Sequence, residues 1–245
     1  MPEERQIAEA AAWIRNASRA AALTGAGVSA ESGVPTFRGA GGLWEGHRIE
    51  EVATPEAFDR DPVLVWEFYD ARRTGLVRCR PNRAHEALAE LERRISDFTL
   101  ITQNVDDLHR AAGSRKLIEL HGNLWRMRCT AGCGEWEDRR APLPRPLPPA
   151  CRCGAPARPA IVWFGEWLDP ADLAAAEAAA ARAEVFLVIG TSGIVEPAAS
   201  LARTAAAAGA RVVEINPEPT PLSAVAALSL RGPAGEIVPR LVGTA

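Results

Sequence analysis

The sequence lacks any apolar run that approaches the roughly 20 residues a helix needs to cross a bilayer. It also lacks the uninterrupted apolar core of a signal peptide, because residues 1–16 interleave charged and apolar side chains as an amphipathic helix does. A basic excess is missing too: the formal net charge is -3, which gives no electrostatic footprint for nucleic acid. We expect a cytoplasmic protein with neither membrane nor nucleic acid among its partners, and we expect it to be a monomer.

What is present is the composition of an ordinary folded protein, with 47% hydrophobic and 24% charged residues in a chain of 245. Apolar, strand-like runs each end in small or polar residues and alternate with segments of helical periodicity. The runs cover residues 20–24, 98–102, 117–120, 185–189, 211–215 and 226–230. Helical segments include 82–94 and 170–182, the second preceded by Asp169 as a candidate cap. This alternation predicts an α/β fold, a Rossmann-like doubly wound parallel sheet with helices on both faces.

Two segments break the alternation and are interpreted as insertions. Residues 38–81 hold a Gly-rich loop and then a helix near residues 62–75, and residues 122–160 hold four cysteines and a proline-rich stretch. We expect a single domain over residues 1–245, whose sheet part comprises 1–37, 82–121 and 161–245. The insertions then form a smaller module, with a cofactor loop and helices from the first and a zinc-binding part from the second.

A glycine motif follows the first apolar run. The segment Gly25-Ala26-Gly27-Val28-Ser29-Ala30 fits G-x-G-x-x-G/A between a strand and a helix, where glycines permit a tight turn and a helix N-terminus offers donors to a pyrophosphate. A purely structural turn is the alternative, because this motif alone is a weak signal. A dehydrogenase would continue with a second strand that ends in an acidic residue, whereas this chain continues with Glu31-Ser32-Gly33-Val34-Pro35. The motif therefore indicates a nucleotide but not hydride transfer.

Polar residues also follow the other runs. They are Gln103-Asn104-Val105-Asp106, His121-Gly122-Asn123, Gly190-Thr191-Ser192-Gly193, Asn216-Pro217-Glu218 and Gly232-Pro233-Ala234-Gly235. In an open parallel sheet these positions line one crevice at the carboxyl ends of the strands, where ligands bind. His121 could serve there as a general base, or it could merely cap the end of its strand. The company of Asn104, Asp106 and the glycine turn favours the base.

Together these segments resemble the sirtuins, which are NAD-dependent protein lysine deacylases. The resemblance is carried, in family order, by residues 25–38, 102–109, 120–123, 164–166 and 190–192. It implies that NAD is a co-substrate, that acylated-lysine proteins are the partners, and that nicotinamide and O-acyl-ADP-ribose are products. It also implies that Asn104 and Asp106 act at the nicotinamide end, while His121 takes a proton from the ribose hydroxyl that attacks the acyl carbon.

The resemblance further implies the binding residues. The pyrophosphate lies on the glycine turn, Phe37 and Arg38 close over the nicotinamide ribose, and Ser192, Asn216 and Ala234 surround the adenosine half. The full implied NAD set is Gly25, Ala26, Gly27, Ser29, Ala30, Thr36, Phe37, Arg38, Trp44, Gln103, Asn104, Asp106, His121, Gly190, Thr191, Ser192, Asn216, Pro217, Glu218 and Ala234. The acylated peptide adds as a strand against Val162, Phe164, Gly165 and Glu166, with 193–196 on its other side.

A tyrosine and an arginine stand three residues apart in a segment expected to be helical. Tyr69 is the only tyrosine of the chain, and Arg72 then lies on the same helix face. A phenol beside a guanidinium can bind a carboxylate, although a plain surface helix is the alternative. The pair is similar to the Tyr-x-x-Arg of sirtuins that accept succinyl- and malonyl-lysine, which implies that acidic acyl groups are removed as well as acetyl. Arg73 points about 100° away on the helix and is left out.

Four of the five cysteines form two close pairs, Cys129-x3-Cys133 and Cys151-x-Cys153. Four thiolates fit a tetrahedral structural zinc ion, and sirtuins carry such a site in their small domain. The spacing departs from the usual C-x2-C, and disulfides are the alternative, disfavoured in a reducing cytoplasm. Cys79 has no partner in the sequence and is interpreted as a packed or exposed thiol.

Two other functions remain open from the sequence. An NAD-dependent ADP-ribosyltransferase would use the same co-substrate and break the same glycosidic bond. A non-catalytic zinc- and nucleotide-binding interaction module is the other alternative, and the presence of Asn104, Asp106 and His121 argues against it.

Overall fold

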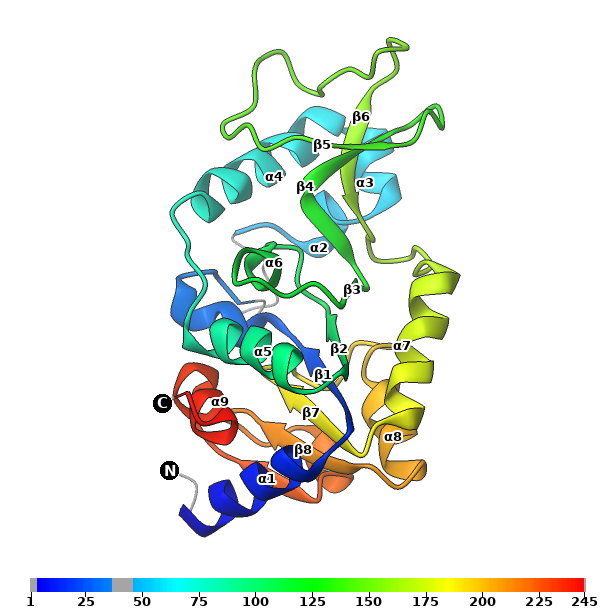
Figure 1. The fold of residues 1–245 in the computed structure, drawn as a ribbon. Coiled ribbons are helices and arrows are strands. Elements are labelled where there is room, and N and C mark those ends of the chain that lie inside the picture. The colour runs from blue at the N-terminus through cyan, green and yellow to red at the C-terminus, as the bar shows by residue number, and fades with distance from the viewer. Residues whose placement is uncertain (1–3, 37–45, 245) are drawn as a thin grey trace.

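The computed structural model describes residues 4–36 and 46–244 (Figure 1). Its larger part is a six-stranded sheet in the order β3-β2-β1-β7-β8-β9, and every neighbouring pair in it is parallel. The strands are β1 (Arg19–Thr24), β2 (Asp97–Thr102), β3 (Leu117–Glu119), β7 (Val185–Ile189), β8 (Arg211–Ile215) and β9 (Leu228–Leu230). The predicted doubly wound sheet is confirmed. The run at 226–230 starts later than expected, because the Ala226 N–H bonds back to the Leu222 carbonyl and closes a turn.

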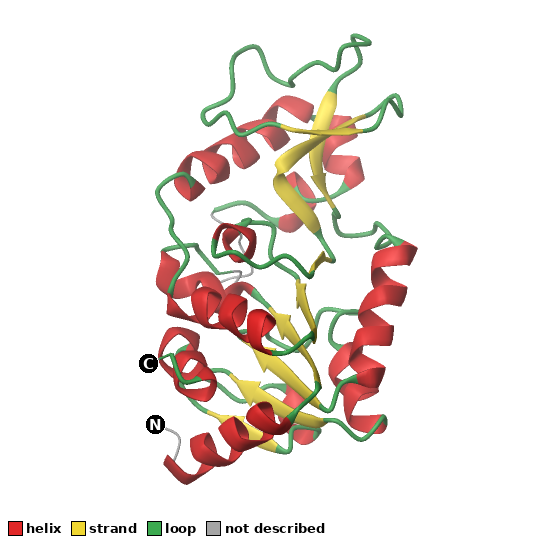
Figure 2. Ribbon diagram, in the orientation of Figure 1, coloured by secondary structure: helices red, strands yellow, loops and turns green. Residues whose placement is uncertain are grey.

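Helices cover both faces of this sheet, as Figures 1 and 2 show. One layer contains α1 (Glu4–Asn16), α5 (Arg83–Arg94) and α9 (Ala234–Val242), and the other contains α7 (Pro170–Arg182) and α8 (Ser200–Ala207). Successive side chains of a strand alternate between the layers: Ala20 and Ala22 of β1 pack with the first, and Ala21 and Leu23 with the second. Asp169 caps α7 as predicted, because its carboxylate accepts hydrogen bonds from the backbone N–H groups that begin the helix.

The smaller module has its own sheet and its own core. Strand β4 (Gly122–Cys129) pairs antiparallel with β5 (Glu135–Glu137) and with β6 (Ala157–Ile161). Three helices share a hydrophobic core with this sheet: α2 (Ile49–Val52), α3 (Pro55–Arg60) and α4 (Pro62–Leu76). Large side chains from α4, from β4 and from the segment after β6 fill the core between them, among them Trp66, Tyr69, Leu124, Met127 and Trp163. The insertions thus form one packed unit, although the sequence analysis did not anticipate its three strands.

Arg73 joins α4 to the segment after β5 inside this module. Its guanidinium is fully buried, pairs with the carboxylate of Asp138, and lies 5.2 Å from the centre of the Trp125 ring. Burial lowers the pKa of Arg73, and the neighbouring Asp138 charge opposes that effect. Arg73 therefore ties α4 to the segment after β5 inside the small module.

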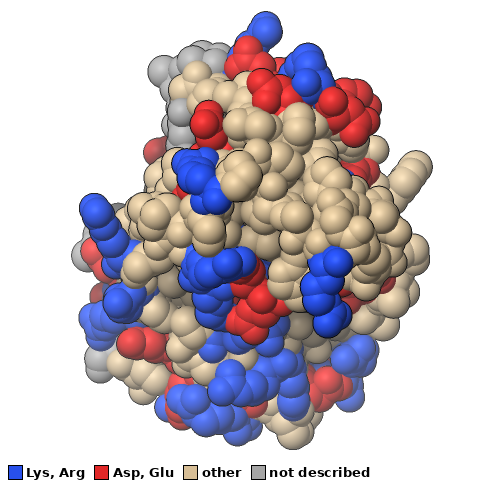
Figure 3. All heavy atoms as spheres, turned by 90° about the horizontal axis from the view of Figure 1, so that it is seen from above, with Lys and Arg blue, Asp and Glu red and all other residues tan. Residues whose placement is uncertain are grey.

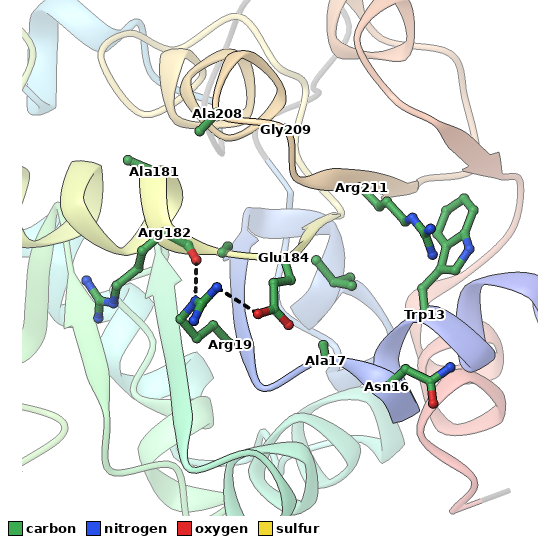
Figure 4. Close-up of a pocket in the computed structure, with 12 residues that line it drawn as sticks. Trp13, Asn16, Ala17, Arg19, Ala181, Arg182, Glu184, Ala208, Gly209 and Arg211 are labelled. Carbon is green, nitrogen blue, oxygen red and sulfur yellow. Dashed lines mark hydrogen bonds and ion pairs between the residues drawn. The ribbon is translucent and has the colours of Figure 1, made fainter.

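A hollow of about 530 Å³ lies where β1, β7 and β8 begin, at the edge of the main sheet opposite the carboxyl ends of the strands (Figure 4). Arg19 pairs there with Glu184 at 2.7 Å and donates to the Arg182 carbonyl at the end of α7. The Arg211 guanidinium lies 4.9 Å from the centre of the Trp13 ring. Arg19 thus offsets the partial negative charge at the C-terminus of α7, and the contact of Arg211 with Trp13 fastens α1 to the sheet. This edge is remote from the predicted site residues. Within the described part of the chain, no helix has the length and apolar character to span a membrane.

Candidate active site

His121 lies in the turn between β3 and β4, where the main sheet passes into the small module. Its Nδ1 is 2.9 Å from the backbone oxygen of Gln103. A carbonyl can only accept, so the Nδ1 position carries the proton and Nε2 keeps its lone pair. Burial lowers the pKa of His121, and the hydrogen bond to Gln103 opposes this effect in part. The imidazole is thus held neutral and oriented, as a general base requires.

The ends of β1 and β2 bring Ser29, Asn104 and Asp106 together. The single Ser29 hydroxyl proton is donated to Asp106 Oδ2 at 2.7 Å, so the hydroxyl oxygen accepts from Asn104 Nδ2 at 3.2 Å. Asn104 Nδ2 also donates to the Gly25 carbonyl at 3.1 Å. Burial raises the pKa of Asp106, while hydrogen bonds from Leu108 and Ser29 lower it. The predicted nicotinamide-end residues therefore form one hydrogen-bonded group with Ser29, in which Asp106 is buried and Asn104 half-buried.

A pair of buried histidines supports this group and was not anticipated. His85 Nε2 lies 3.3 Å from Ser29 Oγ, and His109 Nε2 lies 2.9 Å from Thr24 Oγ1. Their ring centres are 4.6 Å apart. Burial lowers the pKa of His85 to about 4 and the pKa of His109 well below its usual value. Both are uncharged near neutral pH, and the sequence signal for them was a histidine on the apolar face of a helical segment.

The glycines at the end of β1 serve a contact inside the protein. A Cβ on Gly27 would lie 2.7 Å from the Gly190 Cα, and a Cβ on Gly25 would lie 2.8 Å from the Gly190 oxygen. Gly190 itself has a φ of +60° and leaves no room for a side chain against Val28. The N–H groups of Gly25 and Gly27 donate to Ile189 and Gly190. The glycine turn is therefore packed against the end of β7, and the helix that follows it is a 3₁₀ helix, η1 (Ala26–Ser32).

The other predicted NAD residues lie along the same edge of the sheet. Gln103 Nε2 donates to Thr191 Oγ1 at 3.0 Å, which links the ends of β2 and β7. Ala26, Ser29 and Ala30 are in η1 and Thr36 follows it; Gly190, Thr191 and Ser192 follow β7; Asn216, Pro217 and Glu218 follow β8; Ala234 begins α9. Glu31, which was not predicted, accepts from the Gly235 N–H at 2.6 Å and ties α9 to η1. Phe37, Arg38 and Trp44 lie outside the described residues.

Tyr69 and Arg72 both lie on α4, as expected. Tyr69 is fully buried, and its phenol oxygen is 3.1 Å from Trp163 Nε1. Burial raises the pKa of Tyr69, and the charge of Arg72 lowers it. The same Arg72 charge also acts on Asp106, whose pKa is raised mainly by burial. Tyr69 and Arg72 are called the acyl pair below. The charge of Arg72 thus influences both Tyr69 and Asp106.

The predicted peptide segment runs from the end of β6 past the base. The Val162 N–H donates to the His121 carbonyl at 2.9 Å, and the Phe164 N–H donates to the Ala53 carbonyl at 3.0 Å. Gly165 has a φ of +88°, and Glu166 is held by the guanidinium of Arg158 at 2.6 and 2.7 Å. Phe164 is 44% exposed.

The four paired cysteines converge on one point. The Sγ atoms of Cys129, Cys133, Cys151 and Cys153 all lie within 4.8 Å of one another. Cys129 and Cys153 are 3.6 Å apart, close to the roughly 3.8 Å edge of a tetrahedron with Zn–S bonds of about 2.3 Å. All five cysteines are free thiols, so the donor set fits zinc rather than disulfides. Cys79 is half-buried against the core of the small module, as interpreted.

Acidic and basic side chains are interspersed on the face seen in Figure 3, as expected for a chain of small net charge.

Known proteins match this chain over nearly its whole length. The Sir2 family profile matches residues 25–197. The chain is 50% identical over 242 residues to an NAD-dependent protein deacylase of Pyrococcus furiosus, covering 96% of each chain. It is 53% identical over 233 residues to a protein of the same name from Thermus thermophilus, covering 92% of this chain and 90% of the relative. A Sir2 homologue solved with NAD superimposes with a TM-score of 0.90 at 49% identity, covering 96% and 92% of the two chains. The resemblance to the sirtuins is confirmed, and the chain belongs to the Sir2 family.

Proposed function

We propose that this protein removes acyl groups from lysine side chains of other proteins and consumes NAD in doing so. The observation that carries the proposal is the hydrogen bond from His121 Nδ1 to the Gln103 carbonyl, which leaves the lone pair of Nε2 to act as a base. The relatives named NAD-dependent protein deacylase support it, because they are similar over nearly the whole chain. A neutral, oriented imidazole at the carboxyl edge of a nucleotide-binding sheet suits this reaction.

The residues divide the work in two steps. Bound NAD supplies the anomeric carbon that the acyl oxygen attacks as nicotinamide departs. Asn104 and Asp106, linked through Ser29, hold the nicotinamide end in this step. His121 Nε2 would then accept a proton from the ribose hydroxyl, whose oxygen attacks the acyl carbon. Lysine leaves as the free amine, and addition of one water molecule completes O-acyl-ADP-ribose. The buried histidines stay uncharged and fix Ser29 and the strand ends in place.

Zinc has a structural part in this proposal. Cys129 ends β4, and Cys133 lies in the turn between β4 and β5. Cys151 and Cys153 lie in the loop between β5 and β6. One ion held by all four would tie these loops together and supply no catalytic group, since no ligand position is left open. Cysteines held as thiolates also suit a reducing compartment, which is why we include a cytoplasmic location in the proposal.

The proposal extends to acidic acyl groups. Arg72 supplies a cation whose charge acts on both Tyr69 and Asp106. A guanidinium can hold the distal carboxylate of a succinyl or malonyl group in bidentate fashion, with the neutral Tyr69 phenol as a further donor. Acetyl-lysine has no distal carboxylate and needs neither of these contacts. Val162, Phe164, Gly165 and Glu166 flank the peptide; a related Sir2 protein has been solved with a myristoylated histone peptide.

A peptide panel tests the proposal. The purified protein is incubated with NAD and peptides of one sequence that carry acetyl-, malonyl- or succinyl-lysine, and the products are identified by mass. Release of nicotinamide and O-acyl-ADP-ribose in equal amounts is expected. Transfer of label from adenine-labelled NAD onto protein would instead support the ADP-ribosyltransferase, and absence of nicotinamide release from every peptide would support the non-catalytic module.

A further inference from the structure

Trp163 connects the peptide segment with the acyl pair. It follows β6 between Val162 and Phe164, and only 3% of its surface is exposed. Its Nε1 lies 3.1 Å from the Tyr69 hydroxyl oxygen, and the two rings are stacked at 27° with centres 6.5 Å apart. The indole N–H can only donate, so the phenol oxygen accepts this hydrogen bond. The proton of the phenol is then directed at a group other than Trp163.

The position of Trp163 is fixed without help from Tyr69. The Arg158 guanidinium lies 3.5 Å from the centre of the indole ring and also holds Glu166 through two short hydrogen bonds. Glu166 in turn accepts from the backbone N–H of Trp163 at 2.8 Å. Phe58 packs against the indole with ring centres 5.4 Å apart. Backbone and side chain of Trp163 are both held, so its N–H is a fixed donor that places the phenol.

We propose that Trp163 is a positioning residue for acyl selectivity: its indole N–H holds the Tyr69 hydroxyl where that hydroxyl and Arg72 together meet the distal carboxylate of the acyl group. The proposal rests on the acidic-acyl preference proposed above. A hydrogen bond accepted by a hydroxyl strengthens the bond that the same hydroxyl donates, so Trp163 also makes Tyr69 a better donor to an anion. Burial raises the pKa of Tyr69, which keeps the phenol protonated for this task.

One consequence is that peptide binding and acyl recognition depend on the same short segment, residues 162–164. The neighbours Val162 and Phe164 make backbone hydrogen bonds to His121 and Ala53, while the side chain between them reaches the acyl pair. A displacement of this segment therefore moves the base, the peptide wall and the Tyr69 hydroxyl together.

The test compares two tryptophans of the same module. Trp163→Phe keeps an aromatic ring and removes the N–H donor. Trp66→Phe is the matched control, because Trp66 is also buried and donates its N–H at 2.7 Å, but to the Ala157 carbonyl. We expect Trp163→Phe to lower kcat/KM for a succinyl peptide about three- to tenfold more than for the acetyl peptide of the same sequence. Trp66→Phe should leave the succinyl-to-acetyl ratio unchanged.

A double-mutant cycle separates positioning from packing. In a Tyr69→Phe background the indole N–H has lost the hydroxyl it places, so adding Trp163→Phe should not change the succinyl-to-acetyl ratio further. An unchanged ratio in the Trp163→Phe single variant, or an equal loss in both backgrounds, would overturn the proposal. In these experiments Arg72→Met shows whether the acyl pair selects acidic groups at all.

A spectroscopic measurement needs no substrate. Tyr69 is the only tyrosine, so tyrosine labelled with carbon-13 at Cζ gives a single resonance. Loss of the hydrogen bond in Trp163→Phe should shift this resonance, and Trp66→Phe should not. If Trp163→Phe does not fold, Tyr69→Phe serves in reverse, since it should shift the Nε1–H resonance of Trp163. If the wild-type protein is inactive on succinyl peptides, the acyl preference is wrong, and with it this role of Trp163. If the wild type is active but the Tyr69 resonance does not shift in Trp163→Phe, only the contact between Trp163 and Tyr69 is contradicted.

Discussion

Replacing Arg72 with Met tests the acyl preference most directly. The guanidinium is half-buried and lies 5.7 Å from the centre of the Phe68 ring, so its contact with a carboxylate would be only partly screened by water. A charge-assisted hydrogen bond in such a place contributes about 1.5–3 kcal/mol. Losing it corresponds to about a 10- to 150-fold lower kcat/KM for a succinyl peptide. Methionine keeps an apolar stem against Phe68, so the acetyl peptide should lose less than about threefold.

The adjacent arginine provides the control for this experiment. Arg73→Met makes the same chemical change one residue away, but Arg73 is fully buried and paired with Asp138. Removing one partner of a buried ion pair costs about 3–5 kcal/mol of unfolding free energy, so urea denaturation should detect it readily. The succinyl-to-acetyl ratio of the folded Arg73→Met protein should match that of the wild type. Equal losses on both peptides in Arg72→Met would refute the role assigned to Arg72.

Three further predictions concern the base, the zinc site and the buried histidines. His121→Ala should lower deacylation about 100-fold or more while nicotinamide exchange continues, because the base acts after nicotinamide departs; in the wild type, activity should fall as pH falls through the lowered pKa of His121, and a pH-independent rate would count against the base. Cys129→Ser should remove zinc, counted by metal analysis, and lower the melting temperature; a protein that keeps one zinc ion per chain would contradict the four-cysteine site. His85 has a folded pKa of about 4 against about 6.5 unfolded, so the unfolded state binds the extra proton between these values. Stability is then full above pH 6.5 and should decline by about 2–3 kcal/mol towards pH 4, and His85→Asn should flatten this decline in urea titrations.

The main sheet could be predicted from the sequence because its strands are buried on both faces. β7 and β8 begin and end at the predicted residues, and the continuous apolar run of β7 is what a strand covered by two helix layers requires. The small sheet had no such signal. β4 mixes buried and exposed residues irregularly, and its pairing with β6 shifts register between Gly122 and Met127. Its strands are set by the contacts of the insertion with α4, which no local pattern records.

The candidate site likewise contains residues that the sequence could predict and residues that it could not. Residues directly after a strand were predictable, because the carboxyl ends of parallel strands meet at one edge. The contacts of His85 with Ser29 and of Trp163 with Tyr69 were not, because they depend on how α5 and the segment after β6 pack in the folded protein. The glycine motif was found, and the structure adds a reason for it: Gly25 and Gly27 lie too close to Gly190 for any side chain.

Charged and polar contacts join the small module to the main sheet near the turn that carries His121. Asp107 directly follows Asp106 and has a φ of +69°, a conformation that a short polar side chain tolerates. Its carboxylate accepts from Asn123 Nδ2 at 2.9 Å and pairs with Arg139 of the module at 2.6 Å. Asn123 also donates to Glu119 at 2.7 Å, so both ends of the turn that carries His121 are fastened to the main sheet. The geometry of the base is therefore set by the junction of the two parts, and neither the sheet nor the zinc module alone would hold His121 in place.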